Sequence, residues 1–235
     1  MVVDFHAHIL PGADHGSDGL ETSLGQLHLI RDAGVDAVVA TPHFYPHRHT
    51  LSDFLARRDL AAKALAENMP QGAPEIFLGA EVLVCPHLDQ MEGLSKLTIK
   101  GTNVILLEMP FRPLNGELTE TVFAIKAMGL FPVLAHIDRY EKADIWPMLR
   151  AGIAAQLNAS SLKNHHRLRR ESDYLAGDFV VALGSDLHGA KPKKYRPFVH
   201  SRRLLGERAD AIFDRTEKLL SGALPLEKEE LVLTH

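Results

Sequence analysis

Histidines and carboxylates gather at the ends of apolar runs in this sequence. His6 and His8 end the first run, and a strand projects alternate side chains to one face, so this pair places two imidazoles side by side. Neutral imidazole is a ligand for zinc, iron and related ions. One such pair does not establish a metal site, but the arrangement recurs. Further candidates fall at the carboxyl ends of separate strand-like runs: His43, Glu81, Glu108, His136, Asp186 and His188.

The three acids in this set stand in otherwise apolar surroundings. Burying an unpaired carboxylate costs several kcal/mol, so Glu81, Glu108 and Asp186 each need a cation or strong hydrogen-bond donors. An arginine partner for each acid is the alternative, but the strand-like runs carry almost no arginine or lysine. Carboxylates and imidazoles without a thiolate suit manganese, iron or zinc. The sequence therefore predicts two or three divalent or trivalent ions, which could activate water for phosphoryl displacement.

The elements that must position these side chains alternate between strands and helices. The strand candidates are mostly continuous apolar runs, typical of parallel strands covered on both faces. We expect strands at Val2–Ile9, Ala37–Thr41, Ile76–Val82, Val104–Met109, Pro132–His136, Ala154–Asn158 and Val180–Gly184. Helical spacing lies between them: a helix ended by Gly34, Leu51–Asn68, Glu117–Met128, 144–151, 165–176 and 206–221.

This rhythm predicts an α/β fold with a closed or nearly closed parallel barrel, formed by residues 1–235 as a single domain. In such a barrel the carboxyl ends of all strands meet on one face, where the ligand candidates would gather. A doubly wound open sheet is the alternative. Against it, no glycine-rich phosphate loop follows any of the runs.

Composition excludes several classes of protein. The 235 residues are 46% hydrophobic and 24% charged, and the net charge of −4 gives no reason to expect a nucleic acid as partner. No apolar stretch reaches the roughly 18 residues of a membrane span, so we expect a protein that is not integral to the membrane. The first residues do not resemble a signal peptide, and we expect a cytoplasmic location. Cys85 is the only cysteine and has no Cys-x5-Arg signature of a cysteine-dependent phosphatase.

An ordered set of motifs across essentially the whole chain resembles the polymerase-and-histidinol-phosphatase (PHP) superfamily of metallophosphoesterases. Within it, the segment 8–14, together with Glu108 and Arg139, is most similar to the bacterial capsule-locus tyrosine phosphatases. The superfamily motifs are His6-Ala7-His8, Thr41-Pro42-His43, Glu81, His136-Ile137-Asp138-Arg139 and Ser185-Asp186-Leu187-His188.

The resemblance implies a distorted seven-stranded (βα)7 TIM-like barrel with a trinuclear site. His6, His8, Glu81 and Asp186 would hold one metal, and Glu81 would bridge to a second one held by Glu108 and His136. His43 and His188 would hold the third with a residue of the 11–16 loop, and either histidine could return a proton to the leaving group. Arg139 would clamp phosphate, a role that suits a guanidinium fork; a surface salt bridge is the plainer interpretation.

The sequence departs from the family in two places. The family loop Pro-Gly-x-Asp-Asp-Gly reads Pro11-Gly12-Ala13-Asp14-His15-Gly16 here, so we favour His15 over Asp14 as the loop ligand. A second phosphate-binding arginine of the family is replaced by Lys193, with Lys194 or Arg196 as possible substitutes.

The resemblance implies a metal-dependent phosphomonoesterase acting on phosphotyrosine in a protein. The partner would be the tail of a membrane-associated bacterial tyrosine kinase that controls capsule or exopolysaccharide synthesis. Basic stretches at 163–170 and 191–203 could attract such a tail, although solvated faces are the plainer interpretation. Alternatives are a PHP phosphatase for a small metabolite such as histidinol phosphate, a metal-binding scaffold without catalysis, and an amidohydrolase, which usually needs a strand-end lysine. The oligomeric state stays open.

Overall fold

The computed structural model describes residues 1–111, 116–162 and 164–221. The end of the expected 1–235 domain, from residue 222 on, and Lys163 of the first basic stretch lie outside the described residues.

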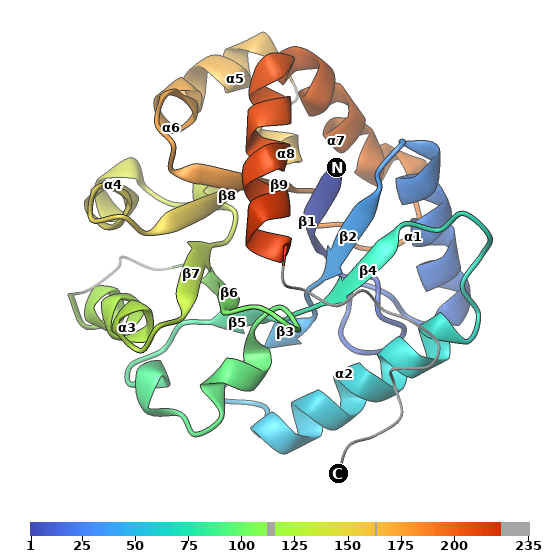
Figure 1. Cartoon of the computed structure of the whole chain (residues 1–235), viewed down its shortest axis with the longest axis horizontal. Helices are drawn as coiled ribbons and strands as arrows, with labels where there is room; N and C mark the ends of the chain where they lie inside the picture. The colour runs from blue at the N-terminus through green and yellow to red at the C-terminus, as the bar shows by residue number, and fades with distance from the viewer. Residues whose placement is uncertain (112–115, 163, 222–235) are drawn as a thin grey trace.

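Parallel strands form the centre of the molecule (Figure 1). They are arranged in a three-stranded sheet of order β1-β2-β4 and a six-stranded sheet of order β3-β5-β6-β7-β8-β9. Their bounds are β1 Val3–Ala7, β2 Ala37–Ala40, β3 His43–Phe44, β4 Glu75–Leu78, β5 Glu81–Leu83, β6 Val104–Glu108, β7 Phe131–Leu134, β8 Ala154–Asn158 and β9 Val180–Gly184.

One of the seven expected strands, Ile76–Val82, is broken into two pieces, and another, Ala37–Thr41, is followed after a break by a short strand that was not expected. The run Ile76–Val82 was expected as one strand, but it is divided between β4 and β5, and β3 continues the course of β2. The register is nevertheless continuous, because pairs in both ladders are 38 residues apart, Ala37 with Glu75 and His43 with Glu81. The breaks therefore interrupt two of the seven strand positions and add no new one.

The ring of strands closes between its first and last members. Ala7 forms a parallel bridge with Leu187, just after β9. The amide of Asp186 donates to the carbonyl of His6 at 2.8 Å, and the amide of His8 donates to the carbonyl of Leu187 at 3.1 Å. Because both breaks keep their register, these contacts complete a distorted seven-stranded parallel barrel, as the sequence predicted.

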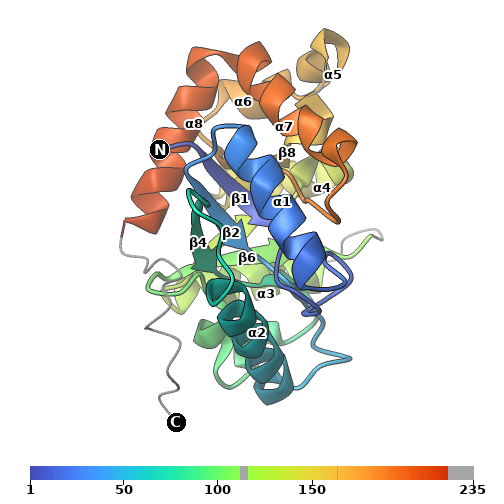
Figure 2. The same cartoon turned by 90° about the vertical axis from the view of Figure 1, so that its right-hand side faces the viewer.

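Helices surround the strands, and α8 lies across the centre of the view in Figure 1. Figure 2 shows α1 in front of β1 and β2, with α2 below the strands in this view. The helices are α1 Leu20–Asp32, α2 Leu51–Ala66, α3 Gly116–Ala127, α4 Lys142–Arg150, α5 His165–Arg170, α6 Ser172–Ala176, α7 Pro192–Leu205 and α8 Glu207–Leu220, with 3-10 turns η1 Leu88–Gln90, η2 Leu94–Leu97, η3 Ile137–Arg139 and η4 Ala159–Leu162. None of these helices is long and apolar enough to cross a membrane.

Two helical expectations need correction. The expected helix 165–176 is divided into α5 and α6, and α7 was not expected at all. Its basic run with Pro197 resembles a loop, because an interior proline removes a helical hydrogen bond. Burial of Tyr195, Phe198 and Leu205 against the barrel compensates for this loss.

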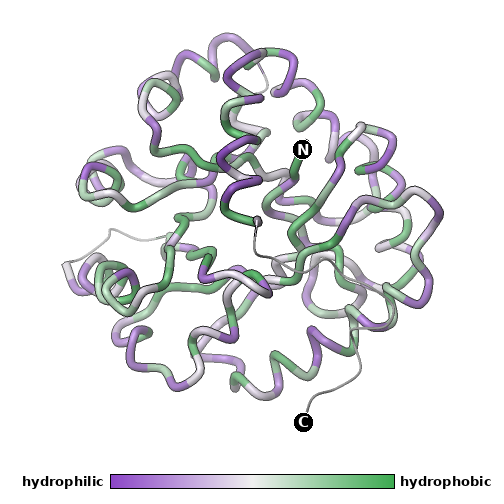
Figure 3. The backbone as a smooth tube through the Cα atoms, in the orientation of Figure 1, coloured by the Kyte–Doolittle hydropathy of each residue, from purple (hydrophilic) through white to green (hydrophobic). Residues whose placement is uncertain are grey.

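The apolar core has two parts. One cluster packs between strands and helices, while a smaller one fills the barrel interior with side chains such as Phe5, Val39 and Leu106 and includes Leu220 of α8. Figure 3 shows this pattern as a hydrophobic centre with more hydrophilic outer helices.

A bulge in β1 brings its two histidines to the inside. From the pair Asp4–Val38 to the pair Ala7–Ala40, β1 advances three residues while β2 advances two. Such an extra residue reverses the alternation of the side chains beyond it. Phe5 therefore packs in the interior and Ala7 in the outer cluster, which leaves the interior to His6 and His8.

Candidate metal centre

Glu81 lies at the centre of the histidines that end the strands. Its Oε1 is 2.7 Å from Nε2 of His136, and its Oε2 is 2.9 Å from Nδ1 of His43. The same Oε2 is 3.2 Å from Nε2 of His6 and 3.3 Å from Nε2 of His8. The site is therefore organised around one buried carboxylate that faces four imidazoles.

Several atoms of this cluster lack ordinary hydrogen bonds. Oε2 of Glu81 and Nδ1 of His43 are buried without a hydrogen-bond partner, although they lie close together. Nε2 of His6 and Nε2 of His8 are 3.1 Å apart, and their other ring nitrogens already face polar side chains. A cation shared by these lone pairs would satisfy all of them, so the donor set fits metal ions.

Three groups of potential ligand atoms each lie within 4.8 Å of one another. Two of the groups combine imidazoles with carboxylates, one consists of imidazoles alone, and none of them includes a thiolate. The groups are His8, His43 and His188; His6, His8 and Glu81; and His43, Glu81 and Glu108.

The other expected ligands lie at the same end of the barrel. Nε2 of His136 is 3.7 Å from Oε1 of Glu108, and Oδ1 of Asp186 is 3.3 Å from Nε2 of His8 and 3.4 Å from Nδ1 of His188. His136 and Asp186 have positive φ angles of 33° and 52°. This conformation ordinarily costs about 1–2 kcal/mol per residue, and it is often found at functional sites.

Opposing electrostatic effects act on the buried acids. Burial alone would raise the pKa of Glu81, but His6, His136 and His43 outweigh it and hold that pKa well below its usual value. Burial and the neighbouring Glu81 carboxylate instead raise the pKa of Glu108 to about 7. The buried acids of the cluster thus differ: the pKa of Glu81 is lowered by its imidazole neighbours, while the pKa of Glu108 is raised by burial and by the Glu81 carboxylate.

Asp14 and His15, in the loop after β1, make different contacts. Oδ2 of Asp14 accepts a hydrogen bond from Nδ1 of His8 at 2.7 Å and from the amide of His43 at 2.9 Å, while Oδ1 accepts from the amide of Gly16 at 2.8 Å. The ring of His15 lies 4.9 Å from that of His43 and 4.7 Å from that of His188. Asp14 therefore orients its neighbours, and His15 is the loop side chain that joins the histidine cluster.

Three polar residues that were not among the sequence-based candidates contact the histidines of the cluster. Oε1 of Gln156 accepts from the amide of His136 at 2.7 Å and lies 3.2 Å from Nδ1 of His6. The hydroxyl of Tyr140 is 3.2 Å from Nδ1 of His136, and Nε2 of Gln26 donates to the carbonyl of His8 at 3.1 Å. A polar residue inside an apolar run was the available signal for Gln156, whereas nothing local marks Tyr140 or Gln26.

A glycine makes room for this network. A Cβ on Gly184, at the end of β9, would lie 2.6 Å from Cβ of His6 and 2.7 Å from Nε2 of Gln156. A Cβ atom does not approach other heavy atoms this closely, so a side chain at position 184 would push His6 or Gln156 out of place.

A cavity of about 410 Å³ opens over the cluster. Arg139 lies on its wall and pairs with Asp186. Of the lysines and arginine offered as second phosphate ligand, Lys194 lines the cavity, while Lys193 and Arg196 are exposed on α7. The side chains that line this cavity are those of His15, His43, Tyr45, Glu108, Phe111, Arg139, Asp186, His188 and Lys194.

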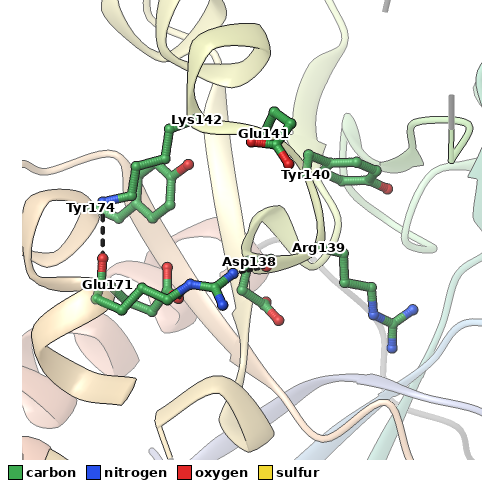
Figure 4. A pocket seen from close by; sticks show the side chains of 8 residues that line it. Asp138, Arg139, Tyr140, Glu141, Lys142, Glu171 and Tyr174 are labelled. Carbon is green, nitrogen blue, oxygen red and sulfur yellow. Dashed lines mark hydrogen bonds and ion pairs between the residues drawn. The ribbon is translucent and has the colours of Figure 1, made fainter. Parts of the chain in front are cut away.

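A second cavity, of about 470 Å³, lies on the other side of Arg139. Figure 4 shows Lys142, Glu171 and Tyr174 grouped together, with the Arg139 side chain extending away from them. The segment from Asp138 to Tyr140 therefore separates this cavity from the histidine cluster.

Comparison with known proteins places this geometry in a family. Residues 2–209 match the family described as "Capsular polysaccharide synthesis, CpsB/CapC". The chain belongs to the CpsB/CapC family. This membership confirms the resemblance to the capsule-locus phosphatases that the motifs indicated.

Curated relatives carry matching names. The putative tyrosine-protein phosphatase CapC of Staphylococcus aureus is 23% identical over 98% of this chain and 93% of its own length. The tyrosine-protein phosphatase CpsB of Streptococcus pneumoniae is 25% identical over 80% of this chain and 83% of its own.

A solved structure supports the fold. It comes from crystal structures of YwqE from Bacillus subtilis and CpsB from Streptococcus pneumoniae, described as unique metal-dependent tyrosine phosphatases. The match has a TM-score of 0.77 at 20% identity and covers 95% of this chain and 96% of that one. The fold expected from the sequence is thereby confirmed.

Proposed function

We propose that this chain is a metal-dependent phosphatase that hydrolyses phosphotyrosine in a partner protein. The observation that carries the proposal is the cluster around Glu81, where buried carboxylate and imidazole lone pairs lack partners beneath a cavity that holds Arg139. The names of the curated CpsB/CapC relatives support the same activity and substrate class. We further propose that residues 1–235 act as one catalytic domain.

Three ions of manganese, iron or zinc would fit the donor atoms. His15 is included because its ring adjoins His43 and His188, whereas Asp14 already accepts three hydrogen bonds. We assign the first ion to His6, His8, Glu81 and Asp186, the second to Glu81, Glu108 and His136, and the third to His15, His43 and His188. Bound ions of this kind activate water as a nucleophile and neutralise phosphate charge.

The chain's own cations complete the phosphate site. The Arg139 guanidinium can donate two parallel hydrogen bonds to phosphate oxygens, a geometry that an ammonium does not provide. In the structure Arg139 pairs with Asp186, and its guanidinium would be free for substrate once Asp186 serves as a metal ligand. Lys194, on the same cavity wall, supplies a second positive charge.

Tyrosine is an undemanding leaving group, because its phenol has a pKa of about 10. A strong general acid is therefore not essential. Nδ1 of His188 donates to the carbonyl of Asp186 at 3.0 Å, which leaves Nε2 with the lone pair that a metal ligand needs. Burial and the neighbouring His8 lower the pKa of His188 to about 4, consistent with a neutral ligand. Proton return by His43 or His188 stays a prediction.

The natural substrate is proposed to be the tail of a membrane-associated tyrosine kinase, met in the cytoplasm. Basic side chains of α5 and of the start of α7 are exposed and both helices pack on η4, beside the carboxyl end of β8. They would attract an anionic, phosphorylated segment, and the attraction would weaken with salt. These side chains are Arg167, Arg169, Arg170, Lys191, Lys193 and Lys194.

An assay on metal-stripped protein tests this function. Manganese, zinc, iron and magnesium would be restored separately, and each sample would receive a phosphotyrosine peptide, a phosphoserine peptide and histidinol phosphate. Metal-restored release from the phosphotyrosine peptide is the expected result. Preference for histidinol phosphate would move the function to a small metabolite, and no release with any metal would contradict a phosphatase.

A further inference from the structure

Two aromatic side chains line an otherwise polar cavity over the histidine cluster. Among the nine lining residues only Tyr45 and Phe111 carry large carbon surfaces, and the others are ionisable side chains. We propose that Tyr45 and Phe111, the aromatic rim, bind the phenyl ring of the substrate and so select aryl phosphates over alkyl phosphates. This inference rests on the proposed function and names the feature that determines its substrate.

Phe111 is an unusual surface residue. It is 66% exposed, and Met1, Leu60 and Met128 are the other large hydrophobic side chains exposed in the described part of the chain. Exposed carbon surface at the edge of a pocket is typical of a binding site, because covering it with a ligand is favourable.

Contacts with the site hold the Phe111 ring in place. Its centroid lies 6.2 Å from that of His136, with the planes 14° apart, and 5.8 Å from that of Tyr140, with the planes 26° apart. His136 is in turn held by Glu81 and Gln156. The ring therefore stands next to the histidine cluster on a rigid support, while most of its surface stays open to solvent.

Tyr45 has the equivalent position on another histidine. Its ring lies 5.0 Å from that of His43, with the planes 19° apart, and it follows β3 directly. His43 and His136 contact the two different oxygens of Glu81. Tyr45 and Phe111 thus pack against two different imidazoles, and each of these imidazoles contacts a different oxygen of Glu81.

This placement matches the shape of an aryl phosphate. If the phosphate binds between the histidine cluster and Arg139, the ester group attached to the phosphate must extend out of the cavity along the side chains that line it. Aromatic rings attract one another in offset or edge-to-face arrangements, by about 0.5–1.5 kcal/mol beyond the burial of their surface. A phenyl ring gains this contact, whereas the short alkyl chain of phosphoserine does not.

Two phosphonates isolate the contribution of the ring. Phenylphosphonate and methylphosphonate share the anionic group, and neither is hydrolysed. Calorimetry would measure the affinity of each for the metal-loaded protein. The difference between the two affinities then reports the contribution of the phenyl ring. We expect phenylphosphonate to bind more tightly to the unmodified protein. Phe111→Ala should reduce that preference roughly 2- to 12-fold without changing the affinity for methylphosphonate. Phe111→Trp should keep the preference, and Tyr45→Leu should reduce it.

Leu60→Ala is the matched control, because Leu60 is 71% exposed and lies on α2, outside the lining of the cavity. It should leave both affinities unchanged. An unchanged preference in both Phe111→Ala and Tyr45→Leu would overturn the inference, as would equal binding of the two phosphonates by the unmodified protein. In either case hydrolysis of the phosphotyrosine peptide would still support the proposed function. If the loaded protein bound neither phosphonate, the phosphate site and the aromatic rim would both be wrong.

Discussion

The carboxylate of Asp14 accepts a hydrogen bond from Nδ1 of His8 at 2.7 Å. This contact turns Nε2 of His8 toward Glu81 and Asp186. The burial of Asp14 would raise its pKa, but His8 and two backbone amides hold that pKa far below its usual value. Asp14 is therefore an ionised carboxylate whose two oxygens already accept hydrogen bonds.

The loop ligand can be identified by counting bound metal. His15→Ala should lower the metal content by about one ion per chain, because it removes the imidazole that we assign to the third ion, whose ring lies 4.9 Å from that of His43 and 4.7 Å from that of His188. Asp14→Asn should keep the number of ions but weaken their binding roughly 10- to 100-fold, the usual effect of losing a group that orients a ligand. Elemental analysis and chelator competition would measure both quantities. A missing ion in Asp14→Asn and a full complement in His15→Ala would reverse the assignment.

Gln156 should matter for metal affinity although it contributes no charge. Gln156→Met keeps the volume but leaves the amide of His136 and Nδ1 of His6 without their partner. We expect metal affinity to fall roughly 10- to 100-fold, with the barrel intact by circular dichroism. Gln90→Met, an exposed glutamine on η1, is the matched control and should have no effect. Unchanged metal affinity in Gln156→Met would show that His6 and His136 keep their orientation without Gln156.

Arg139 should affect turnover and not metal content. Arg139→Ala removes the proposed phosphate clamp, and kcat/KM for a phosphotyrosine peptide should fall on the order of 100- to 1,000-fold. Arg139→Lys should recover only part of this loss, because an ammonium cannot form the two-pronged contact. Arg150→Ala, an exposed arginine on α4, should keep the full rate. Normal kinetics in Arg139→Ala would make the arginine a plain salt-bridge partner of Asp186.

Neighbouring lysines provide a test of the second cation. Lys194 lines the cavity and Lys193 does not, although both are exposed on the first turn of α7. Lys194→Ala should raise KM for the peptide roughly tenfold or more, the value of a charge-assisted hydrogen bond. Lys193→Ala should change it less than about twofold, because Lys193 is not part of the cavity lining and an ion contact made outside it, through solvent, contributes little. Equal effects of the two changes would indicate general attraction by a basic surface.

Glu171 gives the protein a pH-dependent stability outside the metal centre. Its carboxylate is buried and lies 3.1 Å from Nε of Arg170. Burial is the main cause that raises its pKa above 4.5, and Arg170 opposes the effect. The folded state therefore holds this proton more tightly than the unfolded state, so the stabilisation is full below pH 4.5 and is lost as the pH rises through the folded pKa.

Glu171→Gln cannot ionise and so removes this dependence. Its free energy of unfolding relative to the unmodified protein should rise from pH 4 to pH 8. Urea unfolding at a series of pH values would measure the difference between the two proteins. A difference that is constant or that falls with pH would show that the pKa of Glu171 is not raised in the folded state.

The sequence by itself determined the fold class and the set of candidate ligands. Continuous apolar runs predicted buried parallel strands, and the acids inside those runs required a cation, because both signals follow from local residue types. His6, Glu81 and His136 could thus be grouped before any contact was known.

The tertiary structure decided which of these side chains meet and what supports them. The bulge in β1 turns His6 and His8 inward, Asp14 accepts a hydrogen bond from His8, and Lys194 lines the cavity while Lys193 does not. All three depend on the register of neighbouring elements. The contacts of Gln156 with His6 and His136, and of Phe111 with His136, likewise join residues far apart in the chain. Register is set by packing between residues far apart in the chain, so no local pattern reveals it.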